Sequence, residues 1–248
     1  MEKPVYESMY LHEEDFWWFL GMRKISEIFL RNYIMPSVDN KILDAGCGGG
    51  GKFKMLSQYG KVYGIDISQE ALKYSRLRNI AEVSYGSVEK IPMGNNEFNL
   101  VNCNDVLYHS EVGNDVLAMQ EFARVLKPGG ILFIREAAYD WLRGHNDKVV
   151  WVKHRYSKRE IISKLEANGF EILRISYVNC FLFPIALIVR LFERAINRND
   201  IPEDIYNPPF LLNSLFTRIL NAEATVLSFM NLPFGLSIAC VARKKKTV

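Results

Sequence analysis

A run of glycines follows an acidic residue early in the chain, in the stretch ILDAGCGGGGKF at residues 42–53. Gly46 and the glycines at 48–51 have no Cβ atom, so this turn can take positive φ angles and let a ligand lie against its backbone. A helix that opens at Lys52 would offer free N–H groups and the positive end of its dipole to an anionic or carboxylate-bearing ligand. The stretch therefore predicts a binding site for a nucleotide-like molecule.

Two nucleotide-binding patterns fit the same glycines. Gly46, Gly48 and Gly51 satisfy the G-x-G-x-x-G pattern of dinucleotide sites. With Asp44 in front, alternate glycines also satisfy the D-x-G-x-G-x-G pattern of S-adenosylmethionine sites, whose cationic methionine amine a carboxylate attracts. Asp66 ends the next apolar run about twenty residues later, where a carboxylate can accept hydrogen bonds from both ribose hydroxyls of either cofactor.

Two later stretches favour the second pattern. GSVEKIPM at 86–93 and LKPGGILFI at 126–134, together with the glycine-rich turn, resemble the class I S-adenosylmethionine-dependent methyltransferases, in particular their small-molecule, type 11-like branch. The resemblance runs from residue 41 to residue 178 and resumes in the last predicted strand. It implies an enzyme that uses S-adenosylmethionine and releases S-adenosylhomocysteine.

The resemblance also assigns cofactor-binding positions along the first four predicted strands. They are Asp44, Ala45, Gly46, Gly48, Asp66, Ile67, Ser87, Val88, Asn104 and Asp105. The chain departs from the family at Ser87, where Asp or a related polar residue is usual, and at Asn99, where the fourth strand usually has Asp. The contact with the adenine is therefore expected to be weaker or to come from neighbouring backbone.

Methyl transfer from a sulfonium is an in-line displacement, so alignment of donor and acceptor supplies much of the catalysis. A general base is needed only where the acceptor arrives protonated. His109, in NDVLYHS after the fourth predicted strand, is the candidate base because neutral imidazole can take a proton near pH 7. The alternative is that His109 orders its loop or packs under a cap. Glu223 is a second candidate base unless it faces solvent.

Aromatic side chains occur at two places that can reach the acceptor. Tyr108 and Tyr139 follow the fourth and fifth predicted strands, at the edge where open α/β sheets bind ligands. The resemblance further suggests an N-terminal helix that folds over the cofactor. Its candidate acceptor-binding residues are Tyr10, Trp17, Trp18 and Arg23. Core packing is the alternative for each ring, and docking of a second subunit is the alternative for the N-terminal segment.

The elements that must position these residues follow from hydrophobic periodicity. Short apolar runs alternate with amphipathic stretches, which indicates parallel strands joined by crossover helices. The predicted strands cover 41–45, 62–67, 82–86, 98–103, 131–137, 171–178 and 236–243. The predicted helices cover 16–34, 69–79, 116–126, 158–168, 184–197 and 210–230, and Ser68 and Ser157 are expected N-caps. The expected fold class is α/β: a doubly wound, Rossmann-like seven-stranded sheet with an N-terminal helix and a helical insertion between the last two strands.

A single methyltransferase domain of residues 1–248 is expected, because this length can bury one large core. Its expected parts are an N-terminal helical cap at 1–36, a Rossmann-like core at 37–179 and 235–248, and a helical insertion or lid at 180–234. The insertion is strongly apolar, and three roles stay open for it: packing on the sheet, a lid over a greasy or isoprenoid-carrying acceptor, and a dimer or membrane-surface contact. The basic residues that could face lipid headgroups are Arg190, Arg194 and Arg198.

Composition narrows the function classes. A net charge of +3 gives no basic footprint of the kind that nucleic-acid binders carry, so no nucleic-acid partner is expected. The cysteines and histidines show no metal-ligand spacing, so we expect no metal, reduced thiols and a cytoplasmic location. The favoured function is methyl transfer to an oxygen or nitrogen of a small-molecule, lipid-linked or glycan-linked acceptor. The alternatives are a non-catalytic S-adenosylmethionine-binding regulator and an RNA or protein methyltransferase.

Overall fold

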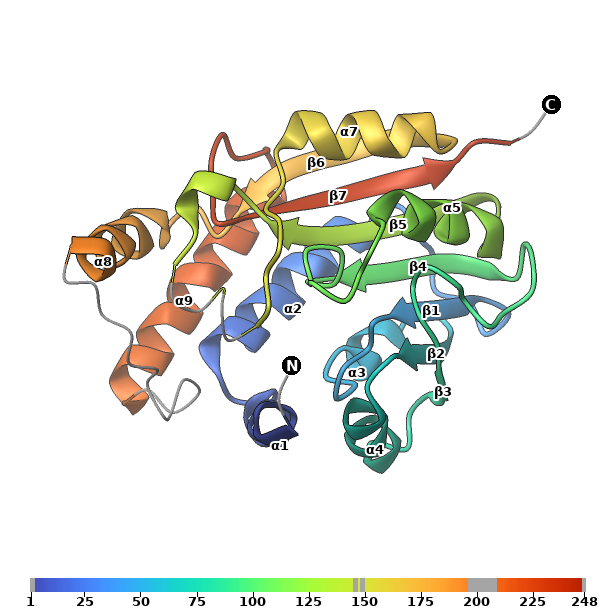
Figure 1. Cartoon of the computed structure of the whole chain (residues 1–248), viewed down its shortest axis with the longest axis horizontal. Coiled ribbons are helices and arrows are strands. Elements are labelled where there is room, and N and C mark those ends of the chain that lie inside the picture. The colour runs from blue at the N-terminus through green and yellow to red at the C-terminus, as the bar shows by residue number, and fades with distance from the viewer. Residues whose placement is uncertain (1–2, 145–146, 148–149, 196–208, 247–248) are drawn as a thin grey trace.

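A computed structural model describes residues 3–144, 147, 150–195 and 209–246. Its centre is one seven-stranded sheet with the order β3-β2-β1-β4-β5-β7-β6 (Figure 1). The strands are β1 Lys41–Ala45, β2 Lys61–Asp66, β3 Glu82–Tyr85, β4 Phe98–Asn104, β5 Leu126–Ala137, β6 Phe170–Val178 and β7 Ser237–Lys244. The expected α/β, Rossmann-like fold class is confirmed.

The last strand in the sequence lies inside the sheet and runs against its neighbours. β1 to β5 pair in parallel, whereas β7 is antiparallel to both β5 and β6. The hydrophobic pattern predicts β7 as a strand but carries no information on its direction. Because of this direction, the start of β7 lies at the sheet edge where β5 and β6 end: Ser237 pairs with Ala137 on one side and Val178 on the other.

The helices correspond to the predicted ones, except that α1 and η1 were not predicted and α3 is shorter than expected. They are α1 Lys3–His12, α2 Trp17–Leu30, α3 Phe53–Leu56, α4 Gln69–Leu77, α5 Asp115–Val125, the 3₁₀ turn η1 Asp140–Leu142, α7 Lys158–Ala167, α8 Phe183–Ala195 and α9 Phe210–Leu227. The sequence patterns do not predict α1. The helix expected to open at Lys52 is the single turn α3, because the chain must reverse at Gly60 to start β2.

Both predicted N-caps are confirmed. The Ser68 hydroxyl accepts a hydrogen bond from the Ala71 amide at 3.3 Å, and the Ser157 hydroxyl accepts one from the Glu160 amide at 3.2 Å. Each cap satisfies a backbone donor that the first helical turn leaves free. The caps therefore fix where α4 and α7 begin after their strands.

Helices cover both faces of the sheet (Figure 1). Residues of α2, α3 and α9 form one buried cluster with Ile42, Leu100 and Phe133, while residues of α5 and α7 form the other with Leu43 and Val101. Neighbouring strand residues thus point to opposite faces, as expected for a sheet that is buried on both sides.

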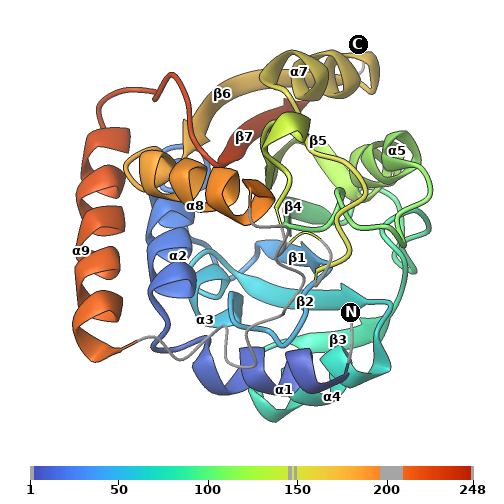
Figure 2. The same cartoon turned by 60° about the vertical axis from the view of Figure 1, so that its left-hand side comes forward.

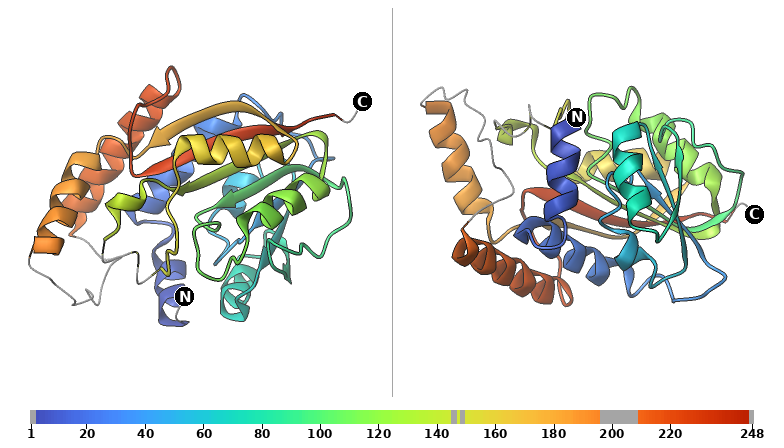
Figure 3. Two further views of the ribbon diagram at one scale, coloured as in Figure 1. Left: turned by 45° about the horizontal axis from the view of Figure 1, so that its top comes forward. Right: turned by 90° about the horizontal axis from the view of Figure 1, so that it is seen from below.

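The inserted helices and the N-terminal helices lie around one edge of the core. α8 and α9 lie at one end of the molecule, far from α5 (Figure 3), and α9 stands beside α2 (Figure 2). α1 lies against α4, where the Tyr10 and Tyr74 rings stack at 5.2 Å. Arg198 and the end of the predicted helix at 184–197 lie outside the described residues. In the described part of the chain, every helix is too short or too polar to cross a bilayer.

Candidate active site

A cavity of about 570 Å³ opens at the edge of the sheet where the parallel strands end. Open α/β sheets place their ligands at this edge. Its walls come from the glycine-rich turn, from the segments that follow β2, β3 and β4, and from α1, α2 and α8. The volume is within the range of pockets that bind small molecules.

The glycine-rich turn presents its backbone to this cavity. Gly46 and Gly48 have φ angles of +76° and +55°, which residues with a Cβ atom rarely adopt. A Cβ atom on Gly46 would lie 2.4 Å from a methyl group of Val106, whereas one on Gly48 would meet no atom within 4 Å. The space over Gly48 is therefore open to a ligand, and the turn itself leaves no room for larger residues at Gly46.

Asp66 ties the end of β2 to this turn. Its carboxylate accepts hydrogen bonds from the Gly48 amide at 2.9 Å and from the Ser68 amide at 2.8 Å. Burial raises the pKa of Asp66, and these two hydrogen bonds oppose the rise. Asp66 lines the cavity together with Ile67, Ser87 and Val88, so four expected cofactor positions lie on one wall.

Asp44 and Ala45 do not line the cavity, because both still belong to β1 and are fully buried under the turn. One oxygen of Asp44 accepts a hydrogen bond from the Asn102 amide at 2.6 Å and lies 3.7 Å from the Lys52 ammonium. The other oxygen has no hydrogen-bond partner. Burial raises the pKa of Asp44, and the Lys52 charge opposes this. The Asp44 carboxylate therefore lies beneath the turn, and its partner Lys52 lines the cavity.

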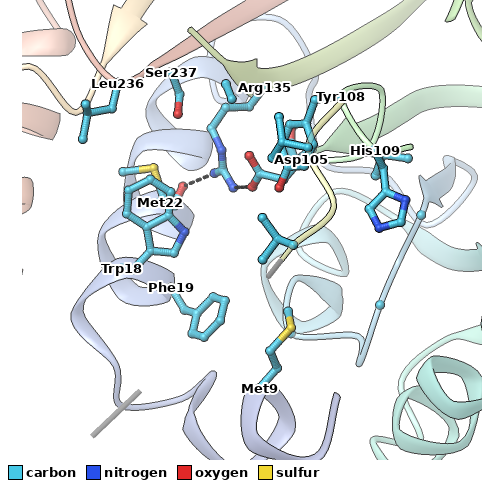
Figure 4. A pocket seen from close by; sticks show the side chains of 18 of the residues that line it. Met9, Trp18, Phe19, Met22, Asp105, Tyr108, His109, Arg135, Leu236 and Ser237 are labelled. Carbon is cyan, nitrogen blue, oxygen red and sulfur yellow. Dashed lines mark hydrogen bonds and ion pairs between the residues drawn. The ribbon is translucent and has the colours of Figure 1, made fainter. Parts of the chain in front are cut away.

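The end of β4 and the loop that follows it line the cavity. Asn104 and Asp105 both line it, and Asp105 holds an ion pair with the buried Arg135 (Figure 4). Asp105 has a φ angle of +61°, a conformation that costs energy for a residue other than glycine. The next residue of β5, Glu136, accepts hydrogen bonds from the amides of Leu107 at 3.0 Å and Tyr108 at 3.1 Å. β5 therefore holds the loop after β4 in place.

His109 lines the cavity at the end of that loop. Its Nδ1 accepts a hydrogen bond from the Glu111 amide at 3.3 Å, and its ring lies 5.8 Å from the Trp151 ring. Burial lowers the pKa of His109, so the imidazole is neutral near pH 7. With Nδ1 occupied as an acceptor, the proton of the neutral ring is on Nε2.

Two expected acceptor residues lie away from the cavity. Tyr10 stacks on Tyr74, and the Arg78 guanidinium lies 4.9 Å from the centre of its ring. Tyr139 stacks on Tyr177 at 5.1 Å, because its φ angle of +60° turns the chain back over β6. Neither ring contributes to the cavity wall.

The other expected acceptor residues are at the cavity. Trp17, Trp18 and Tyr108 line it, and so does Arg23. The Arg23 guanidinium, however, donates to two backbone carbonyl groups, those of Glu13 at 2.6 Å and Gly51 at 3.2 Å. Arg23 therefore clamps the end of α1 to the glycine-rich turn.

The inserted helices close the far side of the cavity. The residues of this segment that line it are Leu182, Ile185, Ala186, Val189, Arg190 and Phe216. Glu223 is not among them: it is fully buried and accepts hydrogen bonds from the amides of Asn179 and Phe181. Glu223 thus fixes the turn from β6 into α8.

Several cavity residues were not expected from the sequence. They are Tyr6, Met9, Glu13, Lys52, Arg135, Arg155, Asn179 and Ser237. Glu13 could not be foreseen without α1, whose end places this carboxylate over Gly51 and pairs it with Arg78 at 2.5 Å. Arg135 could have been predicted from the sequence, because Arg135 and Glu136 interrupt the apolar run ILFIREAA. Burying charged side chains in a strand is costly unless they are paired or bind a ligand.

The described residues hold no cluster of three His, Cys, Asp or Glu side chains that could bind a metal ion. All four cysteines are free and buried. The expected absence of a metal stays a prediction.

Comparison with known proteins supports the expected family. Residues 43–134, which carry the turn, Asp66, Asp105 and most of β5, match the family described as "Methyltransferase domain". Residues 43–134 of the chain thus resemble a methyltransferase domain. The chain is 27% identical over 146 residues to a ubiquinone biosynthesis O-methyltransferase of Idiomarina loihiensis, covering 52% of the chain and 59% of the relative.

A malonyl-[acyl-carrier protein] O-methyltransferase of Enterobacter lignolyticus is 34% identical over 132 residues, covering 52% of the chain and 48% of that protein. The chain thus spans about half the length of the curated relatives it matches. The structure of a putative sarcosine dimethylglycine methyltransferase from Galdieria sulphuraria is similar at a TM-score of 0.59 and 20% identity, covering 92% of this chain and 86% of that one. This similarity shows that the methyltransferase fold continues beyond the matched residues.

Proposed function

We propose that the protein is an enzyme that transfers a methyl group from S-adenosylmethionine to an oxygen or nitrogen of a small-molecule acceptor or of an acceptor linked to a lipid, glycan or other carrier. The observation that carries the proposal is that one cavity joins the glycine-rich turn and Asp66 to an apolar wall from α2 and α8. A cofactor pocket and an acceptor pocket must be continuous for direct transfer.

The residues present fit the cofactor. Gly48 leaves open space over its backbone, and the Asp66 carboxylate has lone pairs left for two ribose hydroxyls beside its two backbone partners. Ser87 and Val88, which the resemblance assigns to the adenine, line the same cavity, and the unpaired oxygen of Asp44 adds negative charge beneath the turn. When bound, S-adenosylmethionine supplies a methyl group on a sulfonium, which a lone pair of the acceptor can attack.

The chain's own residues would bind and orient the acceptor and exclude water. The Trp18 ring and the apolar side chains of α8 face the cavity, so the insertion acts as a lid. An apolar wall that excludes water strengthens the electrostatic interactions inside the site. The two relatives named as O-methyltransferases, for ubiquinone biosynthesis and for a malonyl carrier protein, support an oxygen acceptor on a lipid-like or carrier-linked molecule.

His109 is the proposed base for an acceptor that arrives protonated. Its neutral state suits this role, but Nε2 must be free of its proton to accept another one. The ring must therefore move its proton to Nδ1 and release the weak 3.3 Å hydrogen bond from Glu111. Glu223, buried behind the turn into α8, has no proposed role in proton transfer.

Two further parts of the proposal concern the setting of the enzyme. The buried free cysteines suit the reducing cytoplasm. Exposed apolar side chains on α8, such as Ile188 and Phe192, lie next to the cavity residues Ile185 and Val189 on the same helix. We propose that this face contacts a lipid surface; a dimer contact is the alternative.

The test is transfer of radiolabelled methyl from S-adenosylmethionine into a lysate of the source organism, separated into small-molecule, lipid, RNA and protein fractions. Label in the small-molecule or lipid fraction is expected. Label confined to RNA or to protein other than an acyl carrier would overturn the acceptor class. Cofactor binding without label in any fraction would favour the non-catalytic regulator. An Asp66→Ala variant is the control for transfer by contaminants.

A further inference from the structure

The cavity is also lined by polar side chains at the ends of β5 and β6, which are not among the expected cofactor-binding positions. Arg135, at the end of β5, is 5% exposed and lines the cavity. Its guanidinium pairs with Asp105 and donates to the Met22 carbonyl at 3.5 Å, while its Nε has no hydrogen-bond partner (Figure 4). A guanidinium has five N–H donors, so Arg135 has N–H groups left that could donate to a ligand.

Asn179, at the end of β6, gives an independent sign of a missing ligand. It is fully buried and lines the cavity, and both its amide nitrogen and its amide oxygen are without a partner. Buried amides in native proteins are nearly always hydrogen-bonded. The Glu223 carboxylate accepts a hydrogen bond from the Asn179 backbone amide and so fixes the backbone that carries this unsatisfied side chain.

The sheet brings these two residues together with Ser237. Ser237 begins β7 and pairs with Ala137 of β5 and Val178 of β6. Arg135 lies on the same face as Ala137 two residues on. Asn179 follows Val178 with a φ angle of +60°, and its carbonyl accepts a hydrogen bond from the Leu236 amide at 3.4 Å, next to Ser237. Three polar side chains from three adjacent strands therefore line the same cavity, and Figure 4 shows Arg135 and Ser237 on the side of Met22 and Trp18 of α2.

The charged residues that line the cavity also differ between its two sides. On the side of β1 and β2, the lining groups are two cations and three anions: Arg23, Lys52, Glu13, Asp66 and Glu111. On the side of β5, β6 and α8, the three cations are Arg135, Arg155 and Arg190. Asp105, from the loop after β4, pairs with Arg135, and Asp147 pairs with Arg155, so one positive charge is in excess. The first side suits S-adenosylmethionine, which carries one more positive than negative charge. The second side suits a ligand with negative charge.

We propose that Arg135, Asn179 and Ser237 bind an anionic oxygen group, a carboxylate or a phosphate, of the methyl acceptor. The proposal rests on the proposed function and specifies its acceptor. Planar guanidinium groups bind both anions through paired N–H donors. The Asn179 amide can donate to the anion and accept from a neighbouring hydroxyl. Apolar side chains that line the same cavity, such as Trp18 and Leu236, would contact the apolar part of the acceptor.

The test uses three probes of equal chain length on the full protein saturated with S-adenosylhomocysteine: octanoate, octyl phosphate and octanol. Calorimetry should show at least one of the two anions binding tenfold or more tightly than octanol. The anion that binds more tightly shows whether the site prefers a carboxylate or a phosphate. Arg135→Met should bring the anions to the affinity of octanol while leaving octanol unchanged.

Two further variants separate this result from a folding defect. Asn179→Asp keeps the shape and tolerates the φ angle of +60° at this position, and its negative charge should repel both anions. Arg124→Met removes an arginine that pairs with Glu121 outside the cavity and should leave all three affinities unchanged. Equal binding of the three probes to the parent, or equal losses for anions and octanol in Arg135→Met, would overturn the subsite. Failure of the parent to bind S-adenosylhomocysteine would overturn the proposed function instead.

Discussion

The Asp66 carboxylate holds the glycine-rich turn and is the proposed partner of the ribose. Asp66→Ala removes the acceptor for the Gly48 and Ser68 amides as well as for the ligand. Hydrogen bonds to a charged group contribute about 1.5–3 kcal/mol, so the affinity for S-adenosylmethionine should fall roughly tenfold to hundredfold. Calorimetry measures this directly, with Asp39→Ala on the exposed surface as the control. An unchanged affinity would place the cofactor elsewhere.

Glu136 should make stability depend on pH. Burial first, and then the charge of Asp105, raise the pKa of Glu136 to about 8 from an ordinary value of 4.5. An acid whose pKa is raised by folding binds its proton more tightly in the folded state. Its contribution to stability is therefore full below about pH 4.5 and is lost as the pH rises through 8. The free energy of unfolding should fall by up to about 1.4 kcal/mol per pH unit in this window.

Denaturant unfolding between pH 5 and 9 checks this, with Glu136→Gln as the comparison. The glutamine cannot ionise, so the slope that belongs to Glu136 should be missing from the variant. Other buried acids such as Glu13 and Asp44 contribute equally to both proteins and cancel in the difference. Parallel curves for the two proteins would show that the backbone amides of Val106, Leu107 and Tyr108 keep Glu136 ionised throughout.

At the scale of elements, the position of the proposed lid depends on close packing of α9 against α2. A Cβ atom on Gly21 of α2 would lie 2.3 Å from a methyl carbon of Leu220 on α9. Gly21→Ala should therefore lower the free energy of unfolding by about 1–3 kcal/mol through overpacking, despite the better helix propensity of alanine. In a Leu220→Ala background the same change should cost less but not nothing, because the Cβ atom of residue 220 would still lie 2.6 Å from the new methyl group. A double-mutant cycle by denaturant unfolding measures the coupling, and simple additivity would contradict the contact.

The sequence predicted most elements because their signals are local. Ser68 and Ser157 cap the helices that they were expected to cap, and the seven apolar runs are the seven strands. The turn, Asp66, Ser87 and Val88 were predicted as a set because each follows the end of one strand in a motif of a few residues. Asp44 was expected in the cavity, but its place in β1 buries it under the turn.

The acceptor side was not predictable in the same way. Arg135, Asn179 and Ser237 are far apart in sequence and meet only because β7 enters between β5 and β6. Strand order is a long-range property that hydrophobic periodicity does not encode. Tyr139 shows the same limit on a smaller scale, because one residue with positive φ turned an expected rim residue onto Tyr177.

For the whole molecule, the exposed apolar side chains are concentrated on the insertion. Ile188 and Phe192 on α8 are 68% and 63% exposed, and Phe210 and Leu211 at the start of α9 are 82% and 79% exposed. Large apolar patches of this kind mark contact surfaces. The protein should float with vesicles of anionic phospholipid, and Ile188→Glu with Phe192→Glu should abolish flotation.

Leu77→Glu is the matched control, because Leu77 is an exposed leucine on α4, away from the insertion. It should leave flotation intact. If neither parent nor control floats and the mass from light scattering rises with protein concentration, the patch is a dimer contact. The Ile188→Glu, Phe192→Glu protein should then stay monomeric.

The central place of β7 also has a consequence for synthesis. A ribosome makes β5, β6, α8 and α9 before it makes β7, yet β7 is the strand that joins β5 to β6. Until β7 emerges, β6 has no partner in the sheet and β5 has an open edge. Unpaired strand edges invite wrong pairing with other chains. The proposed acceptor-binding wall of the cavity therefore stays incomplete in the nascent chain while the insertion is synthesised. A chaperone would be most useful to the chain during this period.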